Sequence, residues 1–375
     1  MTSALNVFSL FSGIGGAECG LHIAGHRAIG FCEICPSANA ILRRQFPDAE
    51  LWHTDIRNLT RLPPVDVVTA GFPCTDLSVM GKRRGVHGPD SGLVRECLRL
   101  IAQSPKPRWV IFENVPFMLQ LDQGEAIRVI ITALENANYI WAYRVVNTLT
   151  WLPQHRRRVF IVASPSCDPR FLFAGNYAYN PPADPSHYGF YPNEGRVSIG
   201  WIPNASPTLK GVGYLGLHKS PAQWSPAKNT YTYPSVNDAE MLQGFPVGWT
   251  EGLSDADRFN ALGNAISVPV MQWIGEMLCD PPCGEGSPSR KLSASDPWPS
   301  SAWGREGERF AVETTEFPVE PPRHEVVFSG DEVTQRALQG FRRRTLKSRV
   351  RFHPGFLDAV DDYLRALRVA AIYGG

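Results

Sequence analysis

The chain has 375 residues, of which 43% are hydrophobic and 19% are charged, enough apolar side chains for the cores of about two domains. Its 37 basic and 36 acidic side chains leave a net charge of +1, so any basic surface for a nucleic-acid partner must be local. No run approaches about 18 consecutive apolar residues, and the N-terminus lacks the basic segment of a signal peptide. We therefore expect a cytoplasmic protein with no membrane contact.

The eight cysteines are too few for a disulfide scaffold in a chain of this length, and we expect reduced thiols. Cys32 and Cys35 form one close pair, and Cys279 and Cys283 form a second. These four leave a zinc site as an alternative. The prolines and glycine around the second pair are typical of a loop, so we predict no metal site.

Strands and helices alternate over the first 160 residues or so. Apolar runs predict strands at 5–10, 28–32, 51–53, 65–70, 109–112, 140–146 and 159–163, and helical spacing predicts helices at 16–24, 36–46, 93–101 and 126–134. This alternation predicts an α/β fold with a mostly parallel, doubly wound, Rossmann-like sheet. Ligands bind at the carboxyl ends of the strands in such sheets. Polar or reactive residues follow five of the apolar runs: Gly13, Glu33, Asp55, Cys74 and Glu113.

The alternation is lost at residues 164–234, where eleven prolines are interleaved with seven tyrosines. This composition predicts a smaller second domain of loops and short strands. A capping-box pattern at Ser235 predicts a helix through Leu242, and the apolar run 268–278 predicts that 235–279 returns to the first domain. Residues 280–325, with eight Pro, six Ser and four Gly, are expected to form a flexible linker. Residues 326–375 are expected to be a C-terminal extension of unknown role, with a basic run at 341–352 and a helix at 356–367.

The first predicted strand leads into the glycine-rich turn Ser12-Gly13-Ile14-Gly15-Gly16. Glycine allows a backbone to approach a ligand closely, although this turn is not a P-loop. Glu33 ends the next strand, about 20 residues further on, where an acid can accept hydrogen bonds from ribose hydroxyls. Together these features indicate a nucleoside-containing cofactor. A tight turn followed by a solvated acid is the alternative.

Cys74 follows a strand in the sequence Gly71-Phe72-Pro73-Cys74. A loop cysteine is exposed enough to react, and the nearby Lys82, Arg83 and Arg84 favour a thiolate. Without further support, an inert thiol and a solvated charge run remain the alternatives.

Glu113 in Glu113-Asn114-Val115 emerges from an apolar strand, an environment in which a carboxyl group keeps its proton near neutral pH. Arg156 and Arg158 alternate along Gln154-His155-Arg156-Arg157-Arg158, so on extended chain they point to the same side. Two planar guanidinium groups suit a carbonyl oxygen or a phosphate. A surface acid and a solvated basic edge are the alternatives.

In their order along the chain, six motifs resemble those of the DNA (cytosine-5)-methyltransferases of bacterial or phage type. They are Phe8-Ser9-Leu10-Phe11-Ser12-Gly13-Ile14-Gly15-Gly16, Gly71-Phe72-Pro73-Cys74, Glu113-Asn114-Val115, Gln154-x-Arg156-x-Arg158, Leu242-Gln243-Gly244-Phe245-Pro246 and Leu262-Gly263-Asn264-Ala265. The resemblance covers residues 5–278. It implies a methyltransferase sheet over 1–163 and a target-recognition region over 164–234.

The resemblance also implies the chemistry, in which S-adenosylmethionine methylates C5 of a cytosine flipped out of a specific site in double-stranded DNA. Cys74 would form a covalent bond to C6 of the base. Glu113 would hydrogen-bond to or protonate N3, and Arg158 would bind O2 with Arg156 beside it. No metal is required.

Further site residues follow from the same motifs. The residues implied for the cofactor are Phe11, Gly13, Ile14 and Gly15 in the first loop, Glu33 on the ribose, Ile34 on the adenine ring, Asp55 and Ile56 on its amino edge, and Asn264 and Ala265 from the last motif. The residues implied for DNA are Ser78, Arg83 and Arg84 in the loop after Cys74, and Thr208 in the recognition region.

Several positions depart from the family pattern, including Thr75 where Gln is usual and Ser9 where Asp is common. Thr75 puts the contact to the orphaned guanine in doubt, but none of the departures removes a reacting group. Two alternatives remain open, namely the same chemistry on RNA and a catalytically silent DNA-binding module. A monomer is expected, and a cognate restriction endonuclease is a candidate partner.

Overall fold

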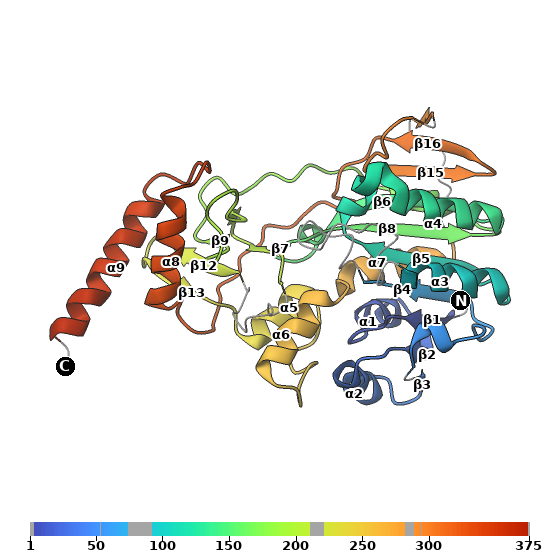
Figure 1. The fold of residues 1–375 in the computed structure, drawn as a ribbon, viewed down its shortest axis with the longest axis horizontal. Helices are drawn as coiled ribbons and strands as arrows, with labels where there is room; N and C mark the ends of the chain where they lie inside the picture. Colours follow the sequence, from blue (N-terminus) through green and yellow to red (C-terminus); the bar gives the residue numbers. More distant parts are fainter. Residues whose placement is uncertain are drawn as a thin grey trace. The chain divides into compact units, whose positions relative to one another are not determined.

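A computed structural model describes residues 4–52, 54–73, 92–210, 221–281, 289–293 and 295–373. The chain divides into two compact units (Figure 1). Unit 1 comprises Met1–Thr150, Arg157–Tyr179 and Ala265–Pro321, and unit 2 comprises Trp151–Arg156, Asn180–Asn264 and Pro322–Gly375. None of the described helices is both long and apolar enough to cross a membrane.

Unit 1 is built on a sheet in which ten described strands follow the order β14-β16-β15-β6-β8-β5-β4-β1-β2-β3. The strands are β1 (Asn6–Leu10), β2 (Arg27–Cys32), β3 (Glu50–Trp52), β4 (Val67–Ala70), β5 (Trp109–Asn114), β6 (Ile140–Asn147), β8 (Arg157–Ser164), β14 (Ser289–Lys291), β15 (Ser301–Arg305) and β16 (Glu308–Val312). The five from β3 to β5 in this order pair in parallel, and the remaining pairs are antiparallel. The predicted strands and the doubly wound α/β class are confirmed. The carboxyl ends of the parallel strands share one edge.

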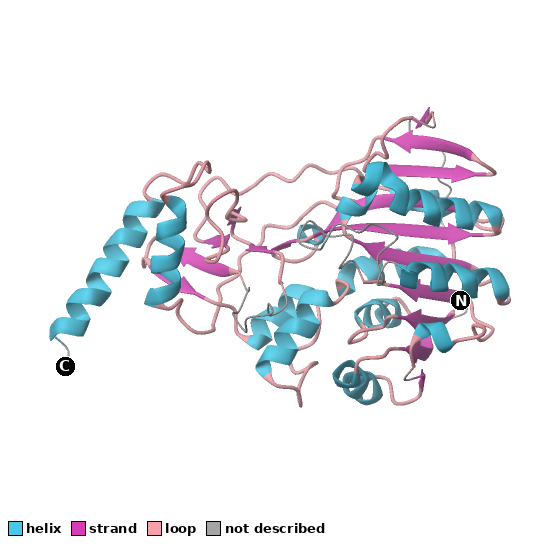
Figure 2. Cartoon of the chain, in the orientation of Figure 1, coloured by secondary structure: helices cyan, strands magenta, loops and turns pink. Residues whose placement is uncertain are grey.

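Helices cover both faces of this sheet (Figure 2). They are α1 (Gly16–Ile23), α2 (Pro36–Gln45), α3 (Gly92–Gln103), α4 (Glu125–Asn136) and α7 (Val268–Leu278). Alternate side chains of a strand point to opposite faces. Phe8 and Leu10 of β1 therefore share a core with residues of α3 and α4, whereas Ser9 between them faces α1. Helix α1 packs directly on α7, because a Cβ atom at Gly20 would lie 2.3 Å from the carbonyl oxygen of Val268.

Residues 280–325 differ from the flexible linker expected there. Three strands of this segment, β14 to β16, extend the sheet, with β15 antiparallel to β6. Ala302 is completely buried, and Trp298 packs on the same core. Few apolar residues suffice here because β15 gains its backbone hydrogen bonds and burial from the edge of a sheet that already exists.

Unit 2 contains a four-stranded sheet in the order β10-β9-β12-β13. Its strands are β9 (Tyr188–Phe190), β10 (Ile202–Pro203), β12 (Ala222–Ser225) and β13 (Thr230–Thr232). The short strands β7 (Gln154–His155) and β11 (Ser206–Pro207) pair in parallel as a separate two-stranded sheet. Its helices are α5 (Val236–Gln243), α6 (Asp255–Asn264), α8 (Gln335–Thr345) and α9 (Phe356–Tyr373).

Two expectations about the chain's organisation change in unit 2. Helices α5 and α6 belong to unit 2, so the chain returns to unit 1 at Ala265 and not at residue 235. The C-terminal extension is part of the core of unit 2, since Phe341 of α8 and Phe356 of α9 lie against Phe190 of β9 at ring-centroid distances of 5.6 and 5.5 Å. The predicted helix in 356–367 is present as α9, and the basic run begins inside α8.

Candidate active site

The glycine-rich turn after β1 adopts a conformation that favours glycine. The φ angles of Gly13 and Gly15 are +54° and +82°, and the Gly15 N–H donates to the Ser12 carbonyl at 3.0 Å. Gly16 is needed for close packing, because a Cβ there would lie 2.3 Å from the carbonyl oxygen of Ile266. At Gly13, a Cβ would meet no described atom within 4 Å. The turn is thus packed against Ile266 at Gly16, whereas the described residues leave space beside Gly13.

Glu33 ties the carboxyl end of β2 to this turn. One of its carboxylate oxygens accepts the Gly13 N–H at 2.8 Å and the other accepts the Cys35 N–H at 2.7 Å. The structure therefore brings two of the predicted cofactor residues, Gly13 and Glu33, into direct contact. The neighbouring Ile34 is 59% exposed.

Phe11, Ile14, Asp55 and Ile56 complete the predicted cofactor residues of unit 1. Phe11 has a φ of +54° and donates its N–H to the Cys32 carbonyl at 2.9 Å, and Ile14 is buried. Asp55 begins a short 3₁₀ turn after β3 and accepts hydrogen bonds from the backbone and side chain of Arg57. These bonds lower the pKa of Asp55. Ile56 is buried beneath this turn.

Glu113 and Arg158 form an ion pair on adjacent strands. Glu113 lies near the end of β5, and Arg158 is at the start of the antiparallel β8. The Arg158 Nε lies 3.0 Å from Glu113 Oε1, and the two side chains are only 18% and 11% exposed. A carboxylate and a guanidinium are thus held together at the sheet edge to which Gly13 and Glu33 also belong.

The turn after β4 lies against the end of β5. The Asn114 amide donates to the Phe72 carbonyl at 3.2 Å, and a Cβ at Gly71 would lie 3.6 Å from Glu113 Oε2. Residues 71–73 lead directly into Cys74. Four predicted site residues, Cys74, Ser78, Arg83 and Arg84, lie outside the described residues.

The remaining predicted residues lie in or next to unit 2. Arg156 is buried and donates from Nη1 to the Gly263 carbonyl at 3.1 Å, so it supports the backbone beside Asn264. From the spacing of Arg156 and Arg158 we expected both guanidinium groups to face a ligand. Arg156 instead donates to the protein backbone. Asn264 is exposed at the end of α6, and Ala265 is buried. Thr208 is half-buried, and its hydroxyl donates to the His155 carbonyl at 2.8 Å.

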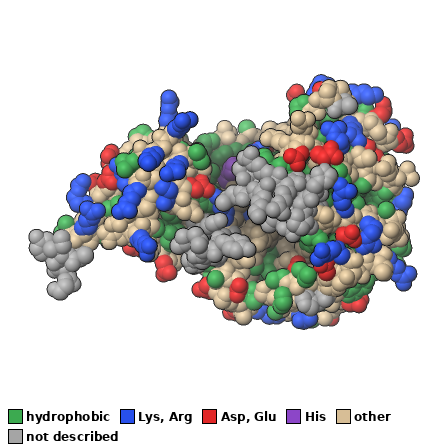
Figure 3. All heavy atoms as spheres, viewed as in Figure 1, with side chains coloured by type: hydrophobic (Ala, Val, Ile, Leu, Met, Phe, Trp, Pro, Cys, Tyr) green, Lys and Arg blue, Asp and Glu red, His purple; other side chains and the backbone are tan. Residues whose placement is uncertain are grey.

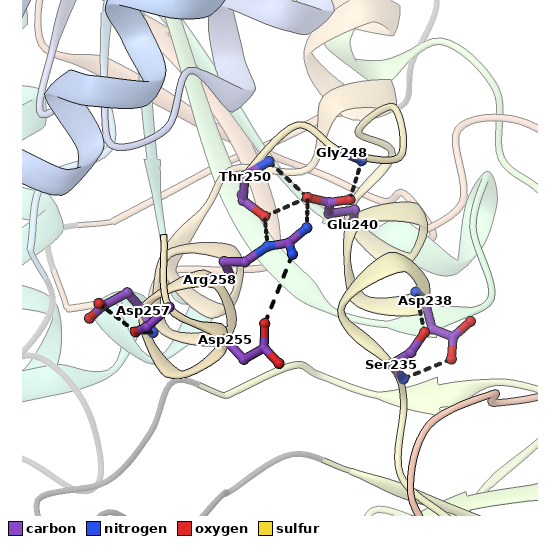
Figure 4. A network of polar contacts seen from close by, with 9 residues as sticks. Ser235, Asp238, Glu240, Gly248, Thr250, Asp255, Asp257 and Arg258 are labelled. Atoms are coloured by element: carbon purple, nitrogen blue, oxygen red, sulfur yellow. Dashed lines mark hydrogen bonds and ion pairs between the residues drawn. The ribbon is translucent and has the colours of Figure 1, made fainter. Parts of the chain in front are cut away.

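Sequence reasoning missed two buried carboxyl groups. Glu18 of α1 lies behind the glycine-rich turn, where Thr69 donates to it at 3.0 Å. Burial raises the pKa of Glu18. Glu240 of α5 accepts hydrogen bonds from Gly248, Thr250 and Arg258 (Figure 4). The only local feature that could have indicated the burial of Glu18 or Glu240 is the position of each acid on the inward face of a predicted helix. That position does not identify the partners of the two carboxyl groups.

Gln154 of the fourth motif joins three segments of unit 2. Its side-chain amide donates to the Leu242 carbonyl at 2.6 Å, and its carbonyl accepts the Leu209 N–H at 2.9 Å. The side chain is completely buried. Gln154 therefore positions the chain around Thr208 and does not act as a reacting group.

Comparisons with known proteins identify the family of the chain. Residues 5–171 match the family described as C-5 cytosine-specific DNA methylase. The chain is 36% identical to the Type II methyltransferase M2.BsuMI of Bacillus subtilis strain 168, over 95% of this chain and 97% of that protein. It is also 36% identical to the Type II methyltransferase M.Bsp6I of Bacillus sp. strain RFL6, over 73% of this chain and 98% of that protein.

Solved structures support the fold separately. The S. pombe Dnmt2 methyltransferase superposes with a TM-score of 0.57 at 19% identity, covering 74% of this chain and 99% of that one. At this identity the likeness bears on the fold alone. The assignment of the chain to a family rests on the identity and coverage of the sequence relatives. The chain therefore belongs to the DNA (cytosine-5)-methyltransferase family and is a DNA cytosine-5 methyltransferase.

Proposed function

We propose that this enzyme methylates a cytosine flipped out of a specific site in double-stranded DNA, using S-adenosylmethionine and a covalent intermediate on Cys74. The observation that carries the proposal is the Glu113–Arg158 pair, held beside the turn that leads into Cys74. A pyrimidine ring needs a nucleophile at C6, an acid or hydrogen-bond donor at N3 and a cation at O2. The motif cysteine and this pair supply these groups.

The chemistry follows from the electronic properties of the ring. A Cys74 thiolate adds to C6, forming an S–C6 bond, and the electrons of the C5–C6 double bond make C5 nucleophilic. Glu113 in its protonated form donates a hydrogen bond or its proton to N3, and the guanidinium of Arg158 stabilises the negative charge that develops at O2. After methylation, a base removes the proton on C5, and the Cys74 thiolate leaves to restore the aromatic ring.

The glycine-rich turn fits the cofactor, because the backbone is open above Gly13 and an acid is anchored beside it. S-adenosylmethionine would supply an electrophilic methyl group bound to a sulfonium. We assign the turn, from Phe11 to Gly15, to its methionine and adenosine end, Glu33 to the ribose, and the exposed Ile34 to the adenine ring. Asp55 and Ile56 are assigned to the adenine edge. Asn264 and Ala265 are assigned from their motif alone.

The target base is buried in the duplex, so it must leave the stack to reach Cys74. We assign Ser78, Arg83 and Arg84 to the loop that binds the opened DNA, and Thr208 of unit 2 to target recognition. The names of the relatives are those of Type II methyltransferases, and a restriction endonuclease of the same specificity is the partner we propose.

The proposal is tested with Cys74→Ala and with Cys35→Ala as the matched control. Cys35 is an exposed thiol outside the proposed reaction. We expect Cys74→Ala to lose transfer of labelled methyl from S-adenosylmethionine to duplex DNA roughly a thousandfold or more, with cofactor binding retained. Cys35→Ala should keep near-normal turnover. The wild type should also form a covalent adduct with duplex DNA containing 5-fluorocytosine. Near-normal turnover by Cys74→Ala would exclude the covalent mechanism.

A further inference from the structure

A group of exposed basic side chains gathers at the end of α8 in unit 2. We call it the arginine turn and define it as Arg196, Arg343, Lys347, Arg349 and Arg351, all of which are exposed. Figure 3 shows Lys and Arg side chains spread over α8 and α9 on this face. Residues 335–351 contain seven basic side chains and no acidic one, although the net charge of the whole chain is only +1.

The arginine turn lacks the counter-charges that neutralise other basic groups nearby. Arg342 pairs with Asp361 of α9 at 2.8 Å, and Arg365 pairs with Asp362 at 2.9 Å. Within the described part of the chain, no ion pair joins any of the five side chains of the turn to an acid. The five side chains therefore give this part of unit 2 a locally positive surface.

The turn is assembled from two segments about 150 residues apart, which are joined by hydrogen bonds. Arg344 donates to the carbonyl oxygens of Glu194 and Pro192 at 2.9 and 2.6 Å. The Arg349 N–H and the Ser348 hydroxyl both donate to the Arg196 carbonyl, at 3.2 and 3.3 Å. Burial, together with the charge of Arg196, lowers the pKa of Arg344. The fold therefore brings cations together at a cost in repulsion.

Two large apolar side chains are exposed within the turn. Val197 is 90% exposed and Leu346 is 74% exposed, and each directly precedes or follows a residue of the cluster. Guanidinium groups match phosphate oxygens in geometry, and contacts to phosphate and sugar position a protein on a duplex without reading its sequence. A regular array of phosphates, such as that of a duplex, satisfies several fixed cations at once.

We propose that the arginine turn binds the phosphate backbone of duplex DNA flanking the methylated site. This inference rests on the proposed function, because it assigns unit 2 to the same DNA. It gives the C-terminal extension a role in affinity that does not depend on sequence. Contacts of this kind release counterions and make binding depend on salt.

The test compares two triple variants of equal charge change. The first is Arg343→Gln/Lys347→Gln/Arg349→Gln. The matched control is Arg27→Gln/Arg61→Gln/Lys106→Gln, three exposed basic residues at or before the amino ends of β2, β4 and β5, opposite the candidate site. Binding of a labelled random-sequence duplex is measured by fluorescence anisotropy at several salt concentrations, after thermal melting has shown that each variant is folded.

Loss of three phosphate contacts should reduce the slope of log K against log salt by about 2.7. When the salt concentration rises from 50 to 200 mM, the fold-loss of affinity should then be about 40 times smaller in the first variant than in the wild type. The control should retain the wild-type slope. An unchanged slope in the first variant would overturn the proposal, and so would a loss of binding confined to duplex RNA. If the first variant shows the reduced slope but the wild type transfers no methyl group to DNA, only the proposed function fails.

Discussion

Glu240→Gln should destabilise unit 2 far more than Asp255→Asn, although both carboxylates face the guanidinium of Arg258. Glu240 is completely buried and lies 3.0 Å from Arg258, whereas Asp255 is 75% exposed and 3.9 Å away. The Glu240 carboxylate also accepts the N–H groups of Gly248 and Thr250 at 2.7 and 2.8 Å (Figure 4). The two substitutions remove the same charge from the same partner, so they isolate the effect of burial.

The magnitude follows from these environments. Removing one member of a buried pair leaves the other charge uncompensated and costs about 3–5 kcal/mol, and in this case the new amide N–H₂ would also face backbone donors. Glu240→Gln should therefore lower the free energy of unfolding of unit 2 by about 3 kcal/mol or more. Asp255→Asn should cost at most about 1 kcal/mol, because water screens an exposed pair.

The assay is urea unfolding, monitored by amide hydrogen exchange in peptides from α5 and α6 so that it reports on unit 2 separately.

Burial opposes ionisation of Glu240, but hydrogen bonds from Thr250, Gly248 and Arg258 outweigh it and lower the pKa of Glu240. The stabilisation is therefore fully present above the ordinary value of 4.5 and is lost as the pH falls toward the pKa of the folded state. Equal losses in the two variants would refute the reasoning.

Two further predictions concern unit 1. Arg144→Met should lower the free energy of unfolding by about 3 kcal/mol or more, seen as a lower midpoint in thermal melting. Arg144 is completely buried, and the substitution removes the donor to four carbonyl oxygens, those of Leu172, Ala174, Gly175 and Thr315. A stability within about 1 kcal/mol of wild type would contradict it. Glu18→Gln should gain stability relative to wild type as the pH rises, because burial raises the pKa of Glu18 and the folded state then resists losing its proton. Urea unfolding at several pH values measures this difference, and parallel pH profiles for the two proteins would show that Glu18 does not contribute.

Much of unit 1 was predictable because its signals are local. The runs that form β1, β2, β4 and β5 are mostly apolar and do not alternate with polar residues, as expected for strands covered on both faces. The glycines at 13 and 15 mark a turn that needs positive φ. Ser235 was predicted to cap a helix, and it does so, with Asp238 completing the capping box.

Other features depended on partners that no local pattern identifies. The strands in 289–312 arise in a segment rich in Pro and Ser because β6 offers an unpaired edge. Arg156 and Arg158 have the same spacing signal, yet one binds the Gly263 carbonyl and the other pairs with Glu113.

The sequence by itself determined the α/β class, the order of the six motifs and hence the family and its reaction. Hydrophobic periodicity and turn residues act over a few neighbouring positions, so they can be read without knowing the fold. Only the tertiary structure decided that the C-terminal extension completes the core of unit 2, that Glu33 anchors the Gly13 turn and that Arg144 is buried with partners far along the chain. Those outcomes depend on which distant segments exclude water from one another, and the free energy of that burial belongs to the assembled fold.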